Sequence, residues 1–230
     1  MTGYDAKAIL RPTLRNLRQT ERELAETCRR HRIGALVGIP WRARDEIHNS
    51  VVFIDRSGRL VMRNLKVHLV GGDKSWGCKP GDTPSPVFPI GRALCSVFIC
   101  HDSRYPELCR LPVLAGARVL FYISHEASLT KEWKMEPYRA QIQARAAENG
   151  VFVVHANAPA NNDLSASHGQ SRIVDPDGNI IEEASLFDEE VLIADLELPE
   201  AKAENALRSL DIPPLDQWWR EGMRQVRVLK

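Results

Sequence analysis

Apolar residues recur at two spacings along the chain, and each spacing predicts a different kind of element. Between residues 12 and 32 the leucines and small apolar residues gather on one helical face and charged residues on the other, which predicts an amphipathic helix. Pro12 suits the first turn of this helix, and Gly34 is expected to end it. A second strong helical pattern covers residues 136–149 and stops at Gly150.

Short apolar runs predict strands, and turn-forming residues between them predict hairpins. Arg-Ser-Gly at 56–58 and Pro-Asp-Gly-Asn at 176–179 each separate two such runs. A short helix is expected at residues 199–210. Because strands and helices alternate, with hairpins between some strands, the pattern indicates an α/β layered domain with mixed sheets. The expected strands are residues 35–40, 49–55, 59–69, 87–90, 93–100, 116–124, 151–158 and 189–198, with a hairpin over 171–183.

The domain organisation follows from length and from the lack of a clear boundary. A chain of 230 residues fits one large domain or two small ones. The loop at residues 73–86 is rich in Gly and Pro but too short for a linker, so we expect it to border a pocket. Trp218 and Trp219 in the tail are expected to anchor the tail or a second copy of the chain, not a substrate.

Composition excludes several classes of partner. Hydrophobic residues make up 43% and charged residues 27% of the chain, as in ordinary globular proteins, and the formal net charge of +1 gives no reason to expect nucleic acid or an anionic membrane as partner. No apolar run approaches the roughly 18 residues of a membrane span, and the first ten residues lack an apolar signal core. A cytoplasmic location is therefore expected. The five cysteines have no C-x-x-C spacing, which argues against a disulfide framework and a zinc site.

Cys100 ends an apolar run and is followed at once by the polar segment HDSRYPEL. One interpretation is a buried structural thiol at a strand end. The other is a nucleophile at a strand-to-helix turn, where unpaired backbone N–H groups lower a thiol pKa and stabilise an oxyanion, with the N–H of His101 as the natural donor. A helix is expected near residues 104–116, with Asp102 or Ser103 as its cap and a kink or early break at Pro112.

Lys66 stands in the segment RNLKVHL, at the end of an apolar strand. A lysine there is often an edge charge that prevents strand-to-strand aggregation. Near a thiolate it would instead be a fixed cation for a tetrahedral oxyanion. Neither Lys66 nor Cys100 is specific by itself.

Five segments in order make the pattern specific: RNLKVHL, KPGD, CHDSRYPELCRLPVLAGARVL, RAAENGVFVVHAN and HGQSRIVDPDGNI. Together they resemble the nitrilase superfamily of carbon–nitrogen hydrolases, over residues 2 to about 198. The resemblance implies a four-layer α-β-β-α sandwich, with residues 1–200 as the hydrolase domain and residues 201–230 as a C-terminal helix and tail that docks or contacts a second copy. It also implies Cys100 as nucleophile, Lys66 as oxyanion partner, no metal and no cofactor, and a homodimer or larger homo-oligomer.

The sequence departs from the family pattern at the general base. The family pattern F-P-E-x-x-x-T-G-Y would place its glutamate about two residues before Met1, since Thr2 is already the T of the pattern. A second family glutamate falls on Lys74, whose acidic neighbour is Asp73. Two explanations stay open. Either the recorded start is internal and a preceding segment carries the glutamate, or the chain is a shortened paralogue with weak or no hydrolase activity.

For the remaining candidate residues, a purely structural role is the alternative to a catalytic one. Asp102 and Arg104 are expected to form an ion pair that braces the turn. Glu148 is expected to form a buried structural pair with Arg145 or with a group near Lys66. The family resemblance implies that Glu148 orients Lys66 and takes no part in the chemistry itself.

Ser124, His125 and Glu126 follow a buried strand at the sheet edge where ligands collect in α/β folds. They would set the polarity of a substrate pocket, and Glu126 could partly replace the missing base. The alternative is an ordinary polar loop.

The sequence therefore predicts a cytoplasmic hydrolase of non-peptide carbon–nitrogen bonds, acting on small amide or N-carbamoyl compounds, and less readily on nitriles, through a cysteine thioester. A second hypothesis is a catalytically silent binding or assembly subunit, because the general-base glutamate is absent. A third is acyl transfer to an amine, which the same thioester permits.

Overall fold

A computed structural model of the chain describes residues 9–43, 45–126, 135–159 and 167–230. The chain divides into two compact units, Met1–Thr83 and Pro84–Lys230. The division falls within the Gly- and Pro-rich loop that the sequence predicts at residues 73–86. Each unit is described by itself.

The first unit combines one long helix with an antiparallel sheet. The sheet has the order β1-β2-β3, and Phe53 of β2 lies opposite Met62 of β3 in the predicted hairpin. Cys28 of α2 packs against Ile39 and Val52 of the sheet, so the apolar face of the helix is buried as its spacing predicts. The elements are α2 (Leu14–His31), β1 (Ala35–Ala43), β2 (Glu46–Ile54), β3 (Leu60–Leu65) and α3 (Gly71–Ser75).

The ends of α2 differ from the prediction. Thr13 is the N-cap and forms a capping box with Asn16, so Pro12 precedes the helix and does not belong to its first turn. At the other end Arg32, with φ of 54°, adopts the left-handed conformation and caps the helix, two residues before Gly34. Helix α3 is one short turn inside the stretch expected to be loop.

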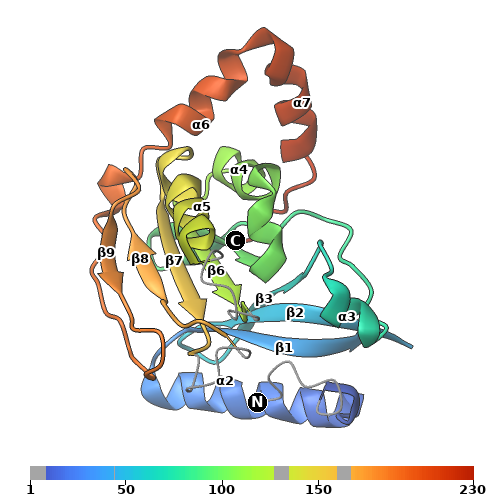
Figure 1. Cartoon of the computed structure of the whole chain (residues 1–230). Helices are drawn as coiled ribbons and strands as arrows, with labels where there is room; N and C mark the ends of the chain where they lie inside the picture. The colour runs from blue at the N-terminus through green and yellow to red at the C-terminus, as the bar shows by residue number, and fades with distance from the viewer. Residues whose placement is uncertain (1–8, 44, 127–134, 160–166) are drawn as a thin grey trace. The chain divides into compact units, whose positions relative to one another are not determined.

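The second unit is built on a six-stranded mixed sheet with the order β4-β5-β6-β7-β8-β9. Strands β5, β6 and β7 are parallel, and the outer pairs are antiparallel hairpins or neighbours. Figure 1 shows β6 to β9 side by side, with α4 and α5 close to the sheet. The strands are β4 (Phe88–Ile90), β5 (Ala93–Ile99), β6 (Val119–Ser124), β7 (Phe152–Asn157), β8 (Arg172–Val174) and β9 (Ile180–Glu183).

Helices cover the hydrophobic core of this unit. Ile142 of α5 and Leu111 of α4 are buried in one cluster with Trp219 of the tail, so the predicted docking of the tail is confirmed for Trp219, while Trp218 stays half exposed. Pro112 does not break α4, which continues to Leu114. The helices and single turns are η1 (Cys100–Arg104), α4 (Pro106–Leu114), α5 (Met135–Ala147), η3 (Leu198–Glu200), α6 (Glu204–Arg208), η4 (Ser209–Asp211) and α7 (Pro213–Met223).

The predicted strand at residues 189–198 is wrong. The structure has no strand over this stretch, and Val191 and Ile193 are 86% and 83% exposed. Alternation of side chains makes a strand only when a neighbouring strand supplies hydrogen bonds, and none of the described strands pairs with this segment. The predicted helix at 199–210 is reduced to α6 between two single turns.

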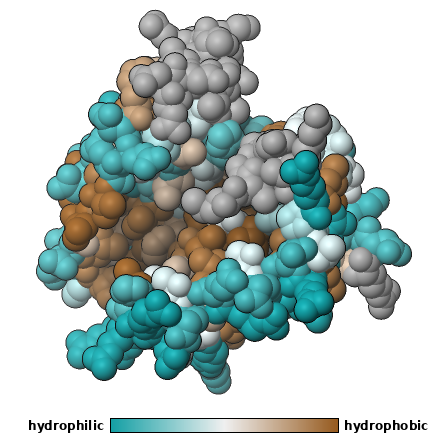
Figure 2. All heavy atoms as spheres, turned by 90° about the horizontal axis from the view of Figure 1, so that it is seen from below, coloured by the Kyte–Doolittle hydropathy of each residue, from teal (hydrophilic) through white to brown (hydrophobic). Residues whose placement is uncertain are grey.

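Figure 2 shows one face of the molecule, on which hydrophobic residues gather in a region bordered by hydrophilic ones. Exposed apolar regions of this kind mark contact surfaces more often than random surface does. Among the described residues no helix has both the length and the apolar character needed to cross a bilayer.

Candidate active site

Cys100 stands directly after β5, at the point where the chain turns. Ile99, the residue before it, lies opposite Ile123 of the parallel strand β6. Cys100 itself has φ of 48°, a left-handed conformation that is uncommon for a residue with a side chain. The single turn η1 begins at Cys100, and α4 begins at Pro106. A strained residue lifted at the end of a strand is the geometry expected of a nucleophile.

The turn differs in one detail from the prediction. The N-cap of α4 is Tyr105, not Asp102 or Ser103, and its side chain makes no capping bond. The intervening turn η1 places Asp102 and Ser103 in the protein interior, where both are buried. The partial positive charge nearest the thiol is therefore that of the turn itself.

Cys100 is the most accessible cysteine of the chain. It is half-buried, whereas Cys28, Cys78, Cys95 and Cys109 are buried. Burial raises the pKa of Cys95 to about 12 and also raises the pKa of the other three buried thiols. Ionised thiol is the reactive form, so these four cysteines are structural.

Lys66 follows β3 and is fully buried, which excludes the alternative of an exposed edge charge. Its Nζ lies 2.6 Å from Oδ2 of Asp73, which is equally buried. Asp73 also accepts hydrogen bonds from Nδ2 of Asn49 at 3.0 Å and from the backbone N–H of Val70 at 2.9 Å. Burial raises the pKa of Asp73, but the hydrogen bond and charge of Lys66 outweigh it and hold that pKa below its usual value.

Lys66 belongs to the first unit and Cys100 to the second. The approach of the ammonium group to the thiol therefore stays a prediction. What the structure establishes is that Asp73 fixes the Lys66 side chain within its own unit.

Polar residues collect where the three parallel strands of the second unit end. Ser124, the last residue of β6, lies opposite Asn157, the last residue of β7, while Cys100 follows the neighbouring strand β5. Glu126 comes two residues after Ser124 and is only 3% exposed. Because the carboxyl ends of parallel strands meet at one edge, the sequence prediction that this edge carries polar side chains is confirmed.

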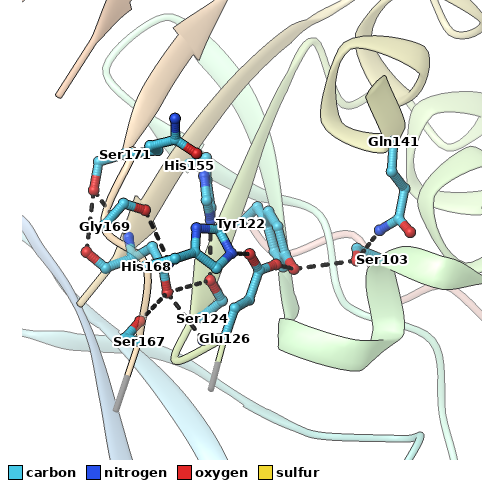
Figure 3. Close-up of polar contacts among 12 residues, drawn as sticks. Ser103, Tyr122, Ser124, Glu126, Gln141, His155, Ser167, His168, Gly169 and Ser171 are labelled. Atoms are coloured by element: carbon cyan, nitrogen blue, oxygen red, sulfur yellow. Dashed lines mark hydrogen bonds and ion pairs between the residues drawn. The ribbon is translucent and has the colours of Figure 1, made fainter. Parts of the chain in front are cut away.

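Glu126 is the centre of a buried polar network, not part of an ordinary polar loop (Figure 3). Tyr122 donates a hydrogen bond to its Oε1. Its Oε2 lies 2.5 Å from Nε2 of His168, a contact less well aligned than a standard hydrogen bond and therefore best described as an ion pair. Burial raises the pKa of Glu126, but the contact with His168 and the hydrogen bond from Tyr122 lower it more, so the carboxylate is ionised.

Asn157 organises the other side of this network. Its Oδ1 accepts from the backbone N–H of Glu126 and from the Ser124 hydroxyl, each at 3.0 Å. Since that hydroxyl has a single proton, Nε2 of His155, 2.9 Å away, must donate to Ser124. Burial lowers the pKa of His155 to about 3, so this histidine is neutral. His125 is only half-buried, unlike His155, but burial lowers its pKa too.

The supporting residues brace the Cys100 turn from α5. Arg145 donates to the carbonyl of Ser103 at 2.9 Å and pairs with Glu148 at 2.9 Å, which confirms the predicted Arg145–Glu148 contact. Arg104 lies over the ring of Tyr138, with Cζ 4.9 Å from the ring centroid, and its expected ion pair with Asp102 stays a prediction.

The ring of His101 lies edge-on to the ring of Tyr105, 6.0 Å away between centroids. Its assigned role as a backbone N–H donor stays a prediction.

Tyr122, His155, Asn157 and His168 are residues that the sequence did not single out. The available signals were weak: Tyr122 precedes Ser124 by two positions and so shares its strand face, and the others stand in the segments HAN and HGQS. Among the described residues no group of three His, Cys, Asp or Glu side chains is arranged to hold a metal ion.

An α/β sheet that carries a strained, half-buried cysteine at the same edge as buried ionisable groups points to an enzyme as the class of protein. Comparison with known families narrows the class. A sequence model described as carbon-nitrogen hydrolase matches residues 2–204, and the chain belongs to this family.

Individual relatives are similar to the chain over most of its length. The 2-oxoglutaramate amidase of Bacillus subtilis is 26% identical over 87% of this chain and 76% of the relative. The N-carbamoylputrescine amidase of Oryza sativa subsp. japonica is 31% identical over 70% of this chain and 58% of the relative. The chain spans between 58% and 77% of the length of the curated relatives it matches.

Solved structures confirm the α/β, nitrilase-like fold. A mutant of the amidase from Nesterenkonia sp. AN1, with the acetamide moiety of fluoroacetamide added covalently at its active-site cysteine, superposes with a TM-score of 0.81. It is 21% identical, over 94% of this chain and 79% of that chain. The chain thus belongs to the carbon–nitrogen hydrolase family and has the α/β fold of that amidase.

Proposed function

We propose that the chain hydrolyses the carbon–nitrogen bond of small amides or N-carbamoyl compounds through a thioester on Cys100. The observation that carries the proposal is the position of Cys100: a half-buried thiol with a left-handed backbone at the carboxyl edge of a parallel sheet. The alternative of a silent binding subunit has no comparable support, because a strained backbone around an inert thiol would only destabilise the fold.

The proposed reaction has two halves. The Cys100 thiolate attacks the carbonyl carbon, and the Lys66 ammonium group and the N–H of His101 hold the negative charge that develops on the oxygen. The carbon–nitrogen bond then breaks, the nitrogen leaves as ammonia or an amine after taking up the proton that Cys100 lost on ionising, and a thioester remains. Water attacks this thioester, which releases the acid and returns the proton to the thiol.

The similarity to relatives named as amidases favours amides and N-carbamoyl compounds over nitriles. The half-buried Ser124 and the buried Glu126, at the same sheet edge as Cys100, support a polar substrate. We further propose that the active form is a homodimer or a larger homo-oligomer.

A substrate panel tests the proposal. Purified protein is incubated with ω-amides, N-carbamoyl compounds and aliphatic nitriles, and ammonia release is measured. We expect turnover of at least one amide or N-carbamoyl compound, none by Cys100→Ala, and turnover retained by Cys28→Ala, which removes a buried thiol in the first unit. Equal activity of the Cys100→Ala variant, or hydrolysis of nitriles alone, would overturn the proposal.

A further inference from the structure

A chain of hydrogen bonds leads from the turn that carries Cys100 to a buried pair of ionisable groups. Ser103, in the same turn, donates to the hydroxyl of Tyr122 at 3.2 Å, and Tyr122 in turn donates to Glu126. Glu126 then contacts His168. Figure 3 shows this order, with the Tyr122 hydroxyl between Ser103 and the Glu126 carboxylate. Every member of the chain belongs to the second unit, so its geometry is internally fixed.

The turn end of this chain is held from α5 as well. Gln141 donates to the hydroxyl of Ser103, and Arg145 donates to its carbonyl. The Ser103 hydroxyl therefore has a single orientation, in which it accepts from Gln141 and donates to Tyr122. A displacement of Tyr122 would therefore move Ser103, and with it the turn that contains Cys100.

The other end of the chain consists of buried ionisable groups. Tyr122, Glu126 and His168 are 0%, 3% and 2% exposed. Taking a carboxylate out of water costs several kcal/mol unless a cation compensates it, and apolar residues of similar size would stabilise a purely structural site at least as well. Ionisable residues retained in such a place, at the sheet edge that carries the candidate nucleophile, indicate a role in its chemistry.

The Glu126 carboxylate and the Cys100 thiol both influence the same hydroxyl group, that of Tyr122. Burial raises the pKa of the Tyr122 hydroxyl first, and negative charge on Glu126 and on Cys100 raises it further. An uncompensated carboxylate there would oppose ionisation of Cys100. The ionisable groups around Glu126 are Tyr122, His155, His168, Arg172 and Arg104.

We propose that Glu126 is a positioning residue for Cys100, acting through Tyr122 and Ser103, and that His168 compensates the charge of Glu126 so that Cys100 can ionise beside it. The inference rests on the proposed function, because it assigns these residues to the same thiol. Glu126 orients the turn and transfers no proton to the substrate. The buried Glu126–His168 pair thereby links the polar edge of the sheet to the reactivity of the Cys100 sulfur atom.

The test compares Glu126→Gln, His168→Gln and the double variant. Two quantities are measured: kcat/KM for ammonia release, and the pH midpoint for alkylation of Cys100 by iodoacetamide, followed by peptide mass spectrometry. Glu126→Gln should lower kcat/KM by roughly 10- to 100-fold, the usual cost of misplacing a reacting group. His168→Gln should move the alkylation midpoint to higher pH, and the double variant should move it back toward the wild-type value. A merely structural role would not produce this reversal.

Further variants keep the inference testable. Tyr122→Phe keeps the ring but breaks the hydrogen-bond chain, so it should lose kcat/KM to a similar extent as Glu126→Gln. Glu182→Gln removes an exposed carboxylate of β9 and should leave both quantities unchanged. If circular dichroism shows that Glu126→Gln does not fold, the same measurements are made on Glu126→Asp and Tyr122→Phe instead.

Two results would overturn the inference: wild-type kcat/KM in folded Glu126→Gln and Tyr122→Phe, or an unshifted alkylation midpoint in His168→Gln. If the wild-type protein released no ammonia from any substrate, the proposed function would fail. The alkylation midpoints would still decide the inference, because they need no substrate.

Discussion

Asp73 determines where the ammonium group of Lys66 lies. Three donors converge on its carboxylate: the Lys66 ammonium, the Asn49 amide and the backbone N–H of Val70. A lysine side chain has four rotatable bonds, and a buried counter-charge is what limits them here. If Lys66 stabilises an oxyanion, the strength of that effect depends on Asp73 as well.

Replacement of Asp73 by Asn keeps the shape of the side chain and removes its charge. We expect Asp73→Asn to lower the free energy of unfolding by about 3–5 kcal/mol at neutral pH, because Lys66 is left as a buried charge without compensation. Urea unfolding measures this loss. A variant as stable as the wild type would contradict the role assigned to the pair.

The same pair has a predictable pH dependence. Because the pKa of Asp73 is lower in the folded protein than its usual value, its contribution to stability is present above the unfolded pKa and is lost as the pH falls through the folded one. Urea midpoints measured from neutral to acidic pH should therefore fall less steeply in Asp73→Asn than in the wild type. Parallel curves would show that other groups control acid unfolding.

At the residue scale the sequence was informative about single positions and poor at networks. Cys100 and Lys66 could be singled out because each stands at a strand end in a recognisable segment. Asp73 was flagged only as an acidic neighbour of Lys74. The pairing of Glu126 with His168 could not be predicted, because it depends on a contact between segments 42 residues apart.

Each of the three parallel strands contributes one ring to a stack that supports the polar edge of the sheet. Phe98, Tyr122 and His155 occupy matching positions of β5, β6 and β7. The Tyr122 ring lies 5.0 Å from Phe98 and 4.5 Å from His155, centroid to centroid, in stacked orientation. The stack fixes the Tyr122 ring from both sides, so its hydroxyl has a defined position at the end of the sheet.

Helix α7 is held to the second unit by one of two adjacent tryptophans. Trp219 is 8% exposed and belongs to the core, whereas Trp218 is 50% exposed. We expect Trp219→Ala to lower the free energy of unfolding by about 3–5 kcal/mol, as for other buried aromatic residues, and Trp218→Ala to have a much smaller effect. Chemical denaturation of the two variants makes the comparison, and equal losses would contradict the assigned packing.

Element types were predicted well where the pattern was local. Both hairpins, the parallel strands and α5 follow from turn residues and apolar spacing within a few positions. The error at residues 189–198 has the opposite origin. Whether an alternating segment becomes a strand depends on a partner elsewhere in the chain, and its own sequence does not contain that information.

At the scale of the whole molecule the proposed chemistry draws on both compact units. The first contributes the Lys66–Asp73 pair and the second contributes Cys100 with its buried network. Family membership and fold agree with the motif order that the sequence displays from Lys66 to the hairpin at 171–183. The general α/β class could be predicted from alternation alone, whereas the division into two compact units is visible only in the folded chain.

The most direct measurement of the central claim is detection of the acyl group on Cys100. The protein is mixed with an amide that it turns over, quenched in acid within the turnover time, and digested for peptide mass spectrometry. The account predicts that the Cys100 peptide gains the mass of the acyl group, that Cys100→Ala shows no adduct and no turnover, and that Lys66→Met forms the adduct more slowly. Turnover that persists in Cys100→Ala, or an acyl group found on another residue, would contradict it.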